Sequence, residues 1–512
     1  MYTGQLQLLS VARRALQESI DQTTQIAVAT ALQGVDAVLN ELMLRQDGAF
    51  FADHYRHGIT LAREGIALLR QDMAERAGLL PGLAELDVPS GDDVSGDTWT
   101  RRYTQLSRLL RDLSHAFADD DEGKPIIAAM FAWEERLYAH ATAAAQLDAP
   151  PQLILSMFTP ESLCAYLRQA RPDWEVIAVR DFDPVPGGFS KATVRFSVED
   201  GHGKLHEMVL RVEPAVSTLG LHSQDLAAEY QVLQLARQHD LAVPEPILFE
   251  ADAGKLGLRF LISARAKGIN CGSFRSASSA ISMELVRDAA RTLAQISHVQ
   301  PDRDDPLAQR SHLGAWAAHD TLGAATEALV RYWYDIATAR GVVSPTIAHT
   351  YEWLIAHVPH CDGRPSLVHG DFGFHNMLVA EDRVSAVLDW EASYLGDPAA
   401  DLCNFLFSTQ GAVERDDLLR FYAQAGGVPI DAERLAYFDL FNAFKITIGS
   451  IAPLHLLNER NDAPLSFAVL GLQYPHFSIA RIPDLLRRAD AAQNAAGPPA
   501  HGSIIERFDA AH

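Results

Sequence analysis

Residues 176–265 contain four short runs that are rich in β-branched and aromatic residues, and one stretch with helical spacing interrupts them. Runs of this composition predict strands, whereas the stretch from about Leu226 to His239 predicts a helix that ends before Pro244. The strand-like runs read VIAVRDF, ATVRFSVE, EMVLRVE and RFLISAR. From about Met283 onward, helical spacing dominates. Strands around one helix, followed by a mainly helical half, predict an α+β fold in two lobes.

The first 150 residues have a different pattern, with apolar residues at three- and four-residue spacing and few strand-like runs. This spacing predicts a separate, all-α N-terminal domain. Its expected helices cover residues 23–46, 50–77, 99–117 and 124–146. The role of this domain stays open, since it could form a homodimer, recruit a protein partner or cover a cleft.

Proline and glycine mark the expected boundaries along the chain. Pro150 and Pro151 end the helical domain, and Thr159 followed by Pro160 has the order of an N-cap and a first helical residue, so a short helix should run to about Gln169. We therefore expect four parts, of which the last, rich in Ala, Gly and Pro, should be a poorly ordered tail. They are a helical domain at 1–150, a β-rich lobe at 151–268, a helical lobe at 269–491 and the tail at 492–512.

Composition excludes several partners. The chain has 512 residues, of which 48% are hydrophobic and 21% charged, and its formal net charge is −23. This charge repels nucleic acid and anionic membrane surfaces, so a ligand that carries phosphate needs a local site. No apolar run approaches the roughly 20 residues of a membrane span. The helical spacing of the first residues and four widely separated cysteines predict a cytoplasmic protein with reduced thiols.

The segment from 367 to 378 places Asp371 and Asn376 five positions apart between two apolar strands. Phosphoryl transfer needs a carboxylate that orients the acceptor hydroxyl and accepts its proton, and oxygen ligands for Mg²⁺. Asp371 suits the first task and Asn376 the second, while Asp389 ends the next apolar strand and suits a second metal ligand. Ordinary turn residues are the structural alternative. The recurrence of base, ligand and ligand in this order favours a kinase that uses ATP and Mg²⁺.

Three motifs carry a resemblance to a known family. HGDFGFHN at 369–376, LDWE at 388–391 and GDPAADL at 396–402 resemble the aminoglycoside phosphotransferase and choline kinase superfamily. The resemblance covers about residues 155–490. LDWE and the upstream VLR at 209–211 are most similar to phosphotransferases related to the kinase-like domain of certain acyl-CoA dehydrogenases. The family resemblance implies a bilobal, protein-kinase-like fold.

Upstream of these motifs, the loop PGGFSK contains Gly187, Gly188 and Ser190 between two expected strands. Glycines in such a loop let backbone N–H groups approach the phosphates of ATP. A hairpin without a ligand would explain Gly-Gly equally well, and the loop lacks the fuller G-x-G-x-x-G pattern. Its position ahead of the catalytic motif favours nucleotide binding.

Two further residues complete the expected nucleotide site. Arg211 occupies the strand position at which kinases carry a phosphate-binding lysine, and its planar guanidinium can pair with phosphate. Glu229 matches the helix glutamate that holds this cation toward the phosphates. A solvent-exposed arginine is the alternative for the first residue, and Glu207 or Glu213 could take the role of the second.

The other polar residues around the motifs have structural interpretations. We expect His369 to brace the catalytic loop, and His375 to be an exposed polar residue of that loop. Glu391 could support the metal site from behind Asp389. Asp397 is explained by helix capping, and for this residue the resemblance adds a role in bracing the loop. Asp401, in the first turn of the same helix, is explained by the helix dipole.

The acceptor is the least determined part of the function. Apolar helices at 402–407 and 438–444 would suit an apolar substrate portion, although aromatic helices of this kind are more often core. With the branch resemblance they favour a hydroxyacyl compound, or its CoA thioester, over an antibiotic. The alternatives are an aminoglycoside or other antibiotic kinase and a nucleotide-binding pseudokinase scaffold.

Overall fold

The structure is a computed structural model of the chain. It describes residues 48–69, 79–84, 86, 96–117, 123–143, 158–185, 191–213, 225–270, 272–273, 276–277, 281–310, 313, 318–361, 363–409, 411–459, 470–471 and 474–496.

The chain divides by contacts into two compact units. Unit 1 comprises Met1–Asp148, Glu327–Pro359 and Asp431–His512, and unit 2 comprises Ala149–Thr326 and His360–Ile430. The units therefore do not follow chain order, because segments from the N-terminal and C-terminal parts belong to the same unit. The four-part division by sequence stays a prediction.

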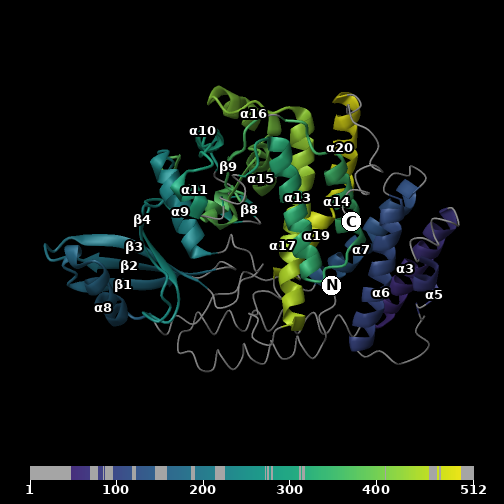
Figure 1. Ribbon diagram of the computed structural model, residues 1–512, viewed down its shortest axis with the longest axis horizontal. Coiled ribbons are helices and arrows are strands. Elements are labelled where there is room, and N and C mark those ends of the chain that lie inside the picture. The colour runs from purple at the N-terminus through teal and green to yellow at the C-terminus, as the bar shows by residue number, and fades with distance from the viewer. Residues whose placement is uncertain are drawn as a thin grey trace. The chain divides into compact units, whose positions relative to one another are not determined.

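The β-rich part of unit 2 is a five-stranded antiparallel sheet with the order β1-β2-β3-β5-β4 (Figure 1). Apolar side chains of β2, β3 and β5 and of helix α8 fill its core. The strands are β1 (Ala178–Val185), β2 (Ala192–Glu199), β3 (Leu205–Val212), β4 (Pro246–Glu250) and β5 (Phe260–Ala264). Helix α8 (Pro160–Ala170) starts as expected, with Thr159 accepting a hydrogen bond from the Ser162 backbone.

Helix α9 (Leu226–Gln238) interrupts these strands and packs against β4 and β5. Its position agrees with the sequence expectation to within a residue. Strand β4 was not expected, because it begins with a proline and all five of its residues are half-buried, which gives no alternation of apolar and polar positions.

The rest of unit 2 is mainly helical and carries three small sheets. Strand β9 (Ser366–Val368) pairs with β12 (Tyr394–Gly396), β10 (Met377–Ala380) pairs with both β11 (Arg383–Val387) and β6 (Ile269–Asn270), and β7 (Gly272–Ser273) pairs with β8 (Ser276–Ala277). The helices are α10 (Met283–Ser297), α11 (Pro306–Arg310), α15 (Ala399–Ser408) and α16 (Arg415–Gln424). A strand-rich part followed by a helix-rich part confirms the predicted α+β class.

Among the residues that the structure describes, unit 1 contains helices and their connections but no strand. Its N-terminal helices are α3 (Gly48–Leu68), α5 (Leu79–Ala84), α6 (Gly96–Ala116) and α7 (Lys124–Ala143). Helices α6 and α7 pack against α14 (Pro345–Ala356) from later in the chain, and α7 also packs against α19 (Pro475–Ile479). Helix α17 (Ala432–Glu459) packs against α14, α19 and α20 (Ile482–Ala496), while α13 (Leu322–Ala339) contains residues of both units. The expected helix at 23–46 lies outside the described residues. Of the expected tail at 492–512, residues 492–496 belong to α20 and the others lie outside the described residues.

Helix α17 contains the aromatic segment that the sequence offered as one wall of an acceptor site. Phe438, Phe441 and Phe444 have no exposed surface, so they belong to the core of unit 1. This confirms the alternative that the segment is part of the core. Its three phenylalanines offer no apolar surface to a substrate. Among the helices described, none combines the length and apolar character needed to span a membrane.

Candidate active site

The catalytic loop connects β9 to β10 and is held by backbone hydrogen bonds. Both carboxylate oxygens of Asp401, in α15, accept hydrogen bonds from this loop, at 2.7 Å from the His369 nitrogen and 2.9 Å from the Gly370 nitrogen. Gly370 has a φ of 81°, and a Cβ there would lie 2.2 Å from the carbonyl oxygen of Ala392. Only glycine fits this turn. These contacts fix the direction of the loop and show that Asp401 braces it, whereas the sequence indicated for Asp401 only a role at the start of the helix. Asp397, for which the resemblance implied the bracing role, accepts a hydrogen bond from the Ala399 nitrogen at 2.9 Å.

His369 is fully buried, and both of its ring nitrogens contact backbone atoms. The Asp371 nitrogen donates to Nδ1 at 3.2 Å, so Nε2 carries the proton and donates to the Leu388 carbonyl at 2.8 Å. The ring also packs against Trp390. These contacts join the catalytic loop to the LDWE segment, and they confirm that His369 is a brace.

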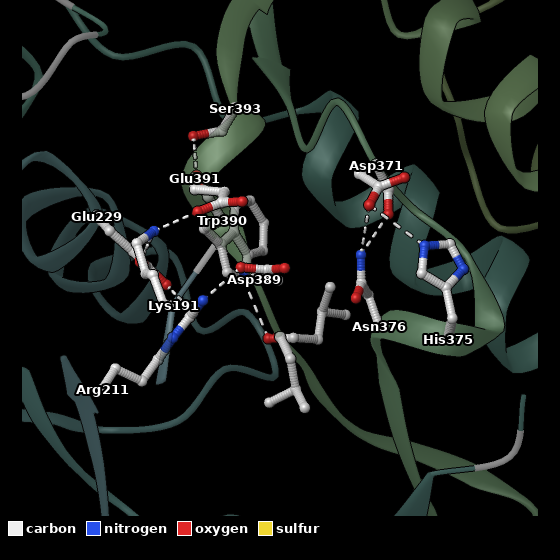
Figure 2. Close-up of polar contacts among 12 residues, drawn as sticks. Lys191, Arg211, Glu229, Asp371, His375, Asn376, Asp389, Trp390, Glu391 and Ser393 are labelled. Carbon is white, nitrogen blue, oxygen red and sulfur yellow. Dashed lines mark hydrogen bonds and ion pairs between the residues drawn. The ribbon is translucent and has the colours of Figure 1, made fainter. Parts of the chain in front are cut away.

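The side chain of Asp371 is 37% exposed and points toward the polar side chains of its own loop (Figure 2). Its Oδ2 accepts a hydrogen bond from Asn376 Nδ2 at 2.9 Å and lies 3.2 Å from His375 Nε2. Asn404 Nδ2 is 3.5 Å from the other oxygen. A carboxylate oriented in this way and still accessible can accept a proton from a bound hydroxyl.

His375 differs from the sequence expectation. Its side chain is only 13% exposed and contacts Asp371, whereas an exposed loop residue was expected. Burial lowers the pKa of His375, but attraction to the Asp371 carboxylate outweighs this effect and raises the pKa above its ordinary value. His375 is therefore part of the surroundings of Asp371.

Asp389 follows β11 and adopts a left-handed conformation, with φ 64° and ψ 60°, at the start of a short helical turn, η5 (Trp390–Ala392). A non-glycine residue in this region is strained, as is common at functional sites. The Leu388 nitrogen donates to the Asn376 carbonyl at 2.8 Å, so the two expected metal ligands lie on paired segments. Burial opposes the charge of Asp389, but the Arg211 and Lys191 cations outweigh burial and keep the pKa of Asp389 below its ordinary value.

The oxygen atoms of this pair suit Mg²⁺. Because the Asn376 amide nitrogen donates to Asp371, its oxygen is the atom left to face a metal, and in the view of Figure 2 it points away from Asp371. In the part of the chain that the structure describes, no group of three or more His, Cys, Asp or Glu side chains could hold a metal. Two protein oxygens with phosphate oxygens as the other ligands are typical of Mg²⁺ in kinases. The residues present therefore fit the metal of a Mg²⁺–nucleotide complex.

The upstream residues meet Asp389 through a cluster of charged side chains (Figure 2). Arg211, on β3, forms an ion pair with Glu229 of α9, and its Nη2 donates to Asp389 Oδ1 at 2.6 Å. The structure thus brings together Arg211, Glu229 and Asp389, and it identifies Glu229, rather than Glu207 or Glu213, as the partner of the strand arginine. Gly187, Gly188 and Ser190 lie outside the described residues.

Sequence reasoning missed one member of this cluster, Lys191. Its side chain is 1% exposed, and its Nζ donates to Glu229 at 2.9 Å and forms an ion pair with Glu391. Burial opposes the charge, but the two carboxylates outweigh burial and raise the pKa of Lys191. Its place directly after the glycine-containing loop was the available signal. We define Lys191, Arg211, Glu229, Asp389 and Glu391 as the charge cluster.

Residues 181–438, half of the chain, match the Phosphotransferase enzyme family, so the chain belongs to this family. This match confirms the resemblance predicted from HGDFGFHN and LDWE. The kinase-like fold predicted from that resemblance agrees with membership of this family. The chain is similar to acyl-CoA dehydrogenase family member 11 of Pongo abelii, with 26% identity over 316 residues that cover 56% of this chain and 38% of that protein.

It is also similar to hygromycin-B 4-O-kinase of Escherichia coli, with 25% identity over 167 residues, 32% of this chain and 48% of that protein. The chain thus spans less than half of the length of these two relatives. A similar solved structure is that of a thermostable mutant of aminoglycoside phosphotransferase APH(4)-Ia with AMP-PNP and hygromycin B. It is 18% identical, has a TM-score of 0.43, and the match covers 64% of this chain and 98% of that one.

Proposed function

We propose that this chain transfers the γ-phosphoryl group of ATP to a hydroxyl group of a small organic molecule. The observation that carries the proposal is the accessible Asp371 carboxylate, fixed by Asn376 of its own loop, whose backbone carbonyl pairs with the Leu388 nitrogen next to Asp389 in the chain. Membership of the Phosphotransferase enzyme family supports the same reaction class.

In this mechanism Asp371 orients the acceptor hydroxyl and takes up its proton as the oxygen attacks the γ-phosphorus, while the bond from that phosphorus to the bridging oxygen breaks and ADP leaves. Asn376 and Asp389 would hold Mg²⁺, which supplies charge neutralisation on the phosphates when it is bound. Arg211 can donate to a phosphate through the same N–H groups that now contact carboxylates. The protein contributes mainly orientation and a fixed set of charges.

For the acceptor, we favour a hydroxyacyl compound or its CoA thioester. The support is the similarity to acyl-CoA dehydrogenase family member 11, since the aromatic residues of α17 are core and no longer contribute. An antibiotic is the second candidate, and it is favoured by the similarity to hygromycin-B 4-O-kinase.

A panel of acceptors tests both proposals. Purified protein with Mg²⁺ and ATP is offered hydroxy acids, their CoA thioesters, hygromycin B and kanamycin, and both ADP and the phosphorylated product are quantified. We expect acceptor-dependent ADP formation with a hydroxyacyl compound. Efficient phosphorylation of an aminoglycoside would reverse the ranking of acceptors, whereas ATP binding without transfer to any acceptor would favour a pseudokinase.

A further inference from the structure

The charge cluster contains two cations, Arg211 on β3 and Lys191 immediately before the neighbouring strand β2. Arg211 pairs with Thr193 in the β2–β3 ladder, and Lys191 precedes Thr193 by two residues. Side chains two positions apart on an extended strand point to the same face. Lys191 and Arg211 are therefore diagonal neighbours on one face of the sheet, and both reach Glu229.

The two cations differ in access. The Arg211 side chain is 18% exposed, whereas that of Lys191 is 1% exposed, with its ammonium group held between two carboxylates. A phosphate can therefore approach Arg211 more readily than Lys191. Lys191 acts on the site through its partners.

These partners come from distant parts of the chain. Glu229 lies on α9, and Glu391 lies in η5, two residues after Asp389. One lysine thus ties the strand that follows the nucleotide loop to the helix carrying Glu229 and to the turn carrying Asp389 (Figure 2). Without it, Glu391 would be a largely buried carboxylate close to Asp389 with no ammonium partner, and such a group is strongly unfavourable.

We propose that Lys191 is a positioning residue for the Mg²⁺–nucleotide site, which neutralises Glu391 and so holds the Asp389 turn against α9. This inference rests on the proposed function. It assigns to Lys191 a role separate from that of Arg211, the cation expected to contact phosphate.

The test compares nucleotide affinity in four proteins: wild type, Lys191→Met, Glu391→Gln with Lys191→Met, and Lys204→Met. Lys204 is an exposed lysine before β3 and serves as a matched control. Affinity for a fluorescent ATP analogue is measured with Mg²⁺, and the KM for ATP and kcat are measured with the best acceptor. Thermal unfolding shows that each protein is folded.

We expect Lys191→Met to weaken nucleotide binding and raise the KM for ATP by about tenfold or more, which is the usual loss when a residue that supports a metal ligand from behind is removed. The KM for the acceptor should not change. Glu391→Gln in the same protein should restore much of the affinity, because it removes the unpaired charge. Lys204→Met should match the wild type.

Equal affinity in wild type and Lys191→Met would overturn the inference, and so would a double variant no better than the single one. If Lys191→Met fails to fold, recovery of folding and affinity in the double variant still supports charge neutralisation, and failure of both variants contradicts it. A wild type that binds no nucleotide would instead overturn the proposed function, so the two failures are distinguishable.

Discussion

Glu229 lies at the centre of the charge cluster, and replacing it by glutamine tests whether this cluster stabilises the fold. The Glu229 side chain is 1% exposed and uses one oxygen for Lys191 and the other for Arg211. Glutamine has nearly the same shape but only one acceptor oxygen and no charge.

The loss in free energy of unfolding depends on which carboxylate partners Lys191 and Arg211 retain. Removal of one partner from a buried ion pair costs about 3–5 kcal/mol. Here Lys191 retains Glu391, Arg211 retains Asp389, and glutamine can still accept one hydrogen bond. We therefore expect Glu229→Gln to lower the free energy of unfolding by about 2–3 kcal/mol, below the full range.

Urea unfolding measures this loss, with hydrogen exchange in α9 assigning the transition to unit 2. Glu207→Gln is the matched control, because Glu207 pairs with Arg265 on the same sheet but is 59% exposed. An exposed pair of this kind contributes less than about 1 kcal/mol. If the two variants lose equal stability, the reasoning about the buried cluster is refuted.

Three more predictions concern the metal, the loop and the pH dependence. Asn376→Ala should raise the Mg²⁺ concentration for half-maximal turnover by about tenfold or more, and an unchanged Mg²⁺ titration would exclude Asn376 as a ligand. Asp401→Asn should lower kcat and the free energy of unfolding together, since the amide nitrogen that replaces one carboxylate oxygen cannot accept a hydrogen bond from the backbone, and unaltered kinetics would contradict the bracing role of Asp401. Burial lowers the pKa of His54 from its usual 6.5 to about 4. Because the folded state disfavours the protonated ring, stability should fall as pH drops from 7 to 5, by about 2 kcal/mol from this group. In urea unfolding, the stability of His54→Gln should therefore fall by about 2 kcal/mol less than that of the wild type between pH 7 and pH 5. The same pH dependence in both proteins would refute this assignment to His54.

The parts of the fold that could be predicted are those with local signals. Strand β2 was expected at its observed residues because its composition favours a strand, and α8 because Thr159 and Pro160 mark a helix start. Asp371 and Asn376 could be paired because their spacing in one loop matches the needs of phosphoryl transfer.

Contacts between distant segments could not be predicted. Lys191 meets Glu391 200 positions later, and Arg211 meets Asp389 178 positions later. Neither pairing produces a periodic pattern in the sequence. The sequence therefore indicated for Lys191 only that it ends the loop PGGFSK. His375 was expected to be exposed, since nothing local shows that the loop folds it onto Asp371.

Turnover by Asp371→Asn is the most direct test of the central claim that Asp371 orients and deprotonates the acceptor. Asparagine keeps the shape of the side chain but cannot accept the proton, so turnover should fall by about 100-fold or more while the affinity for ATP stays at the wild-type value. The measurement uses the acceptor identified by the panel, with phosphorylated product as the readout. Wild-type turnover in this variant would contradict the assignment of Asp371 and with it the proposed mechanism.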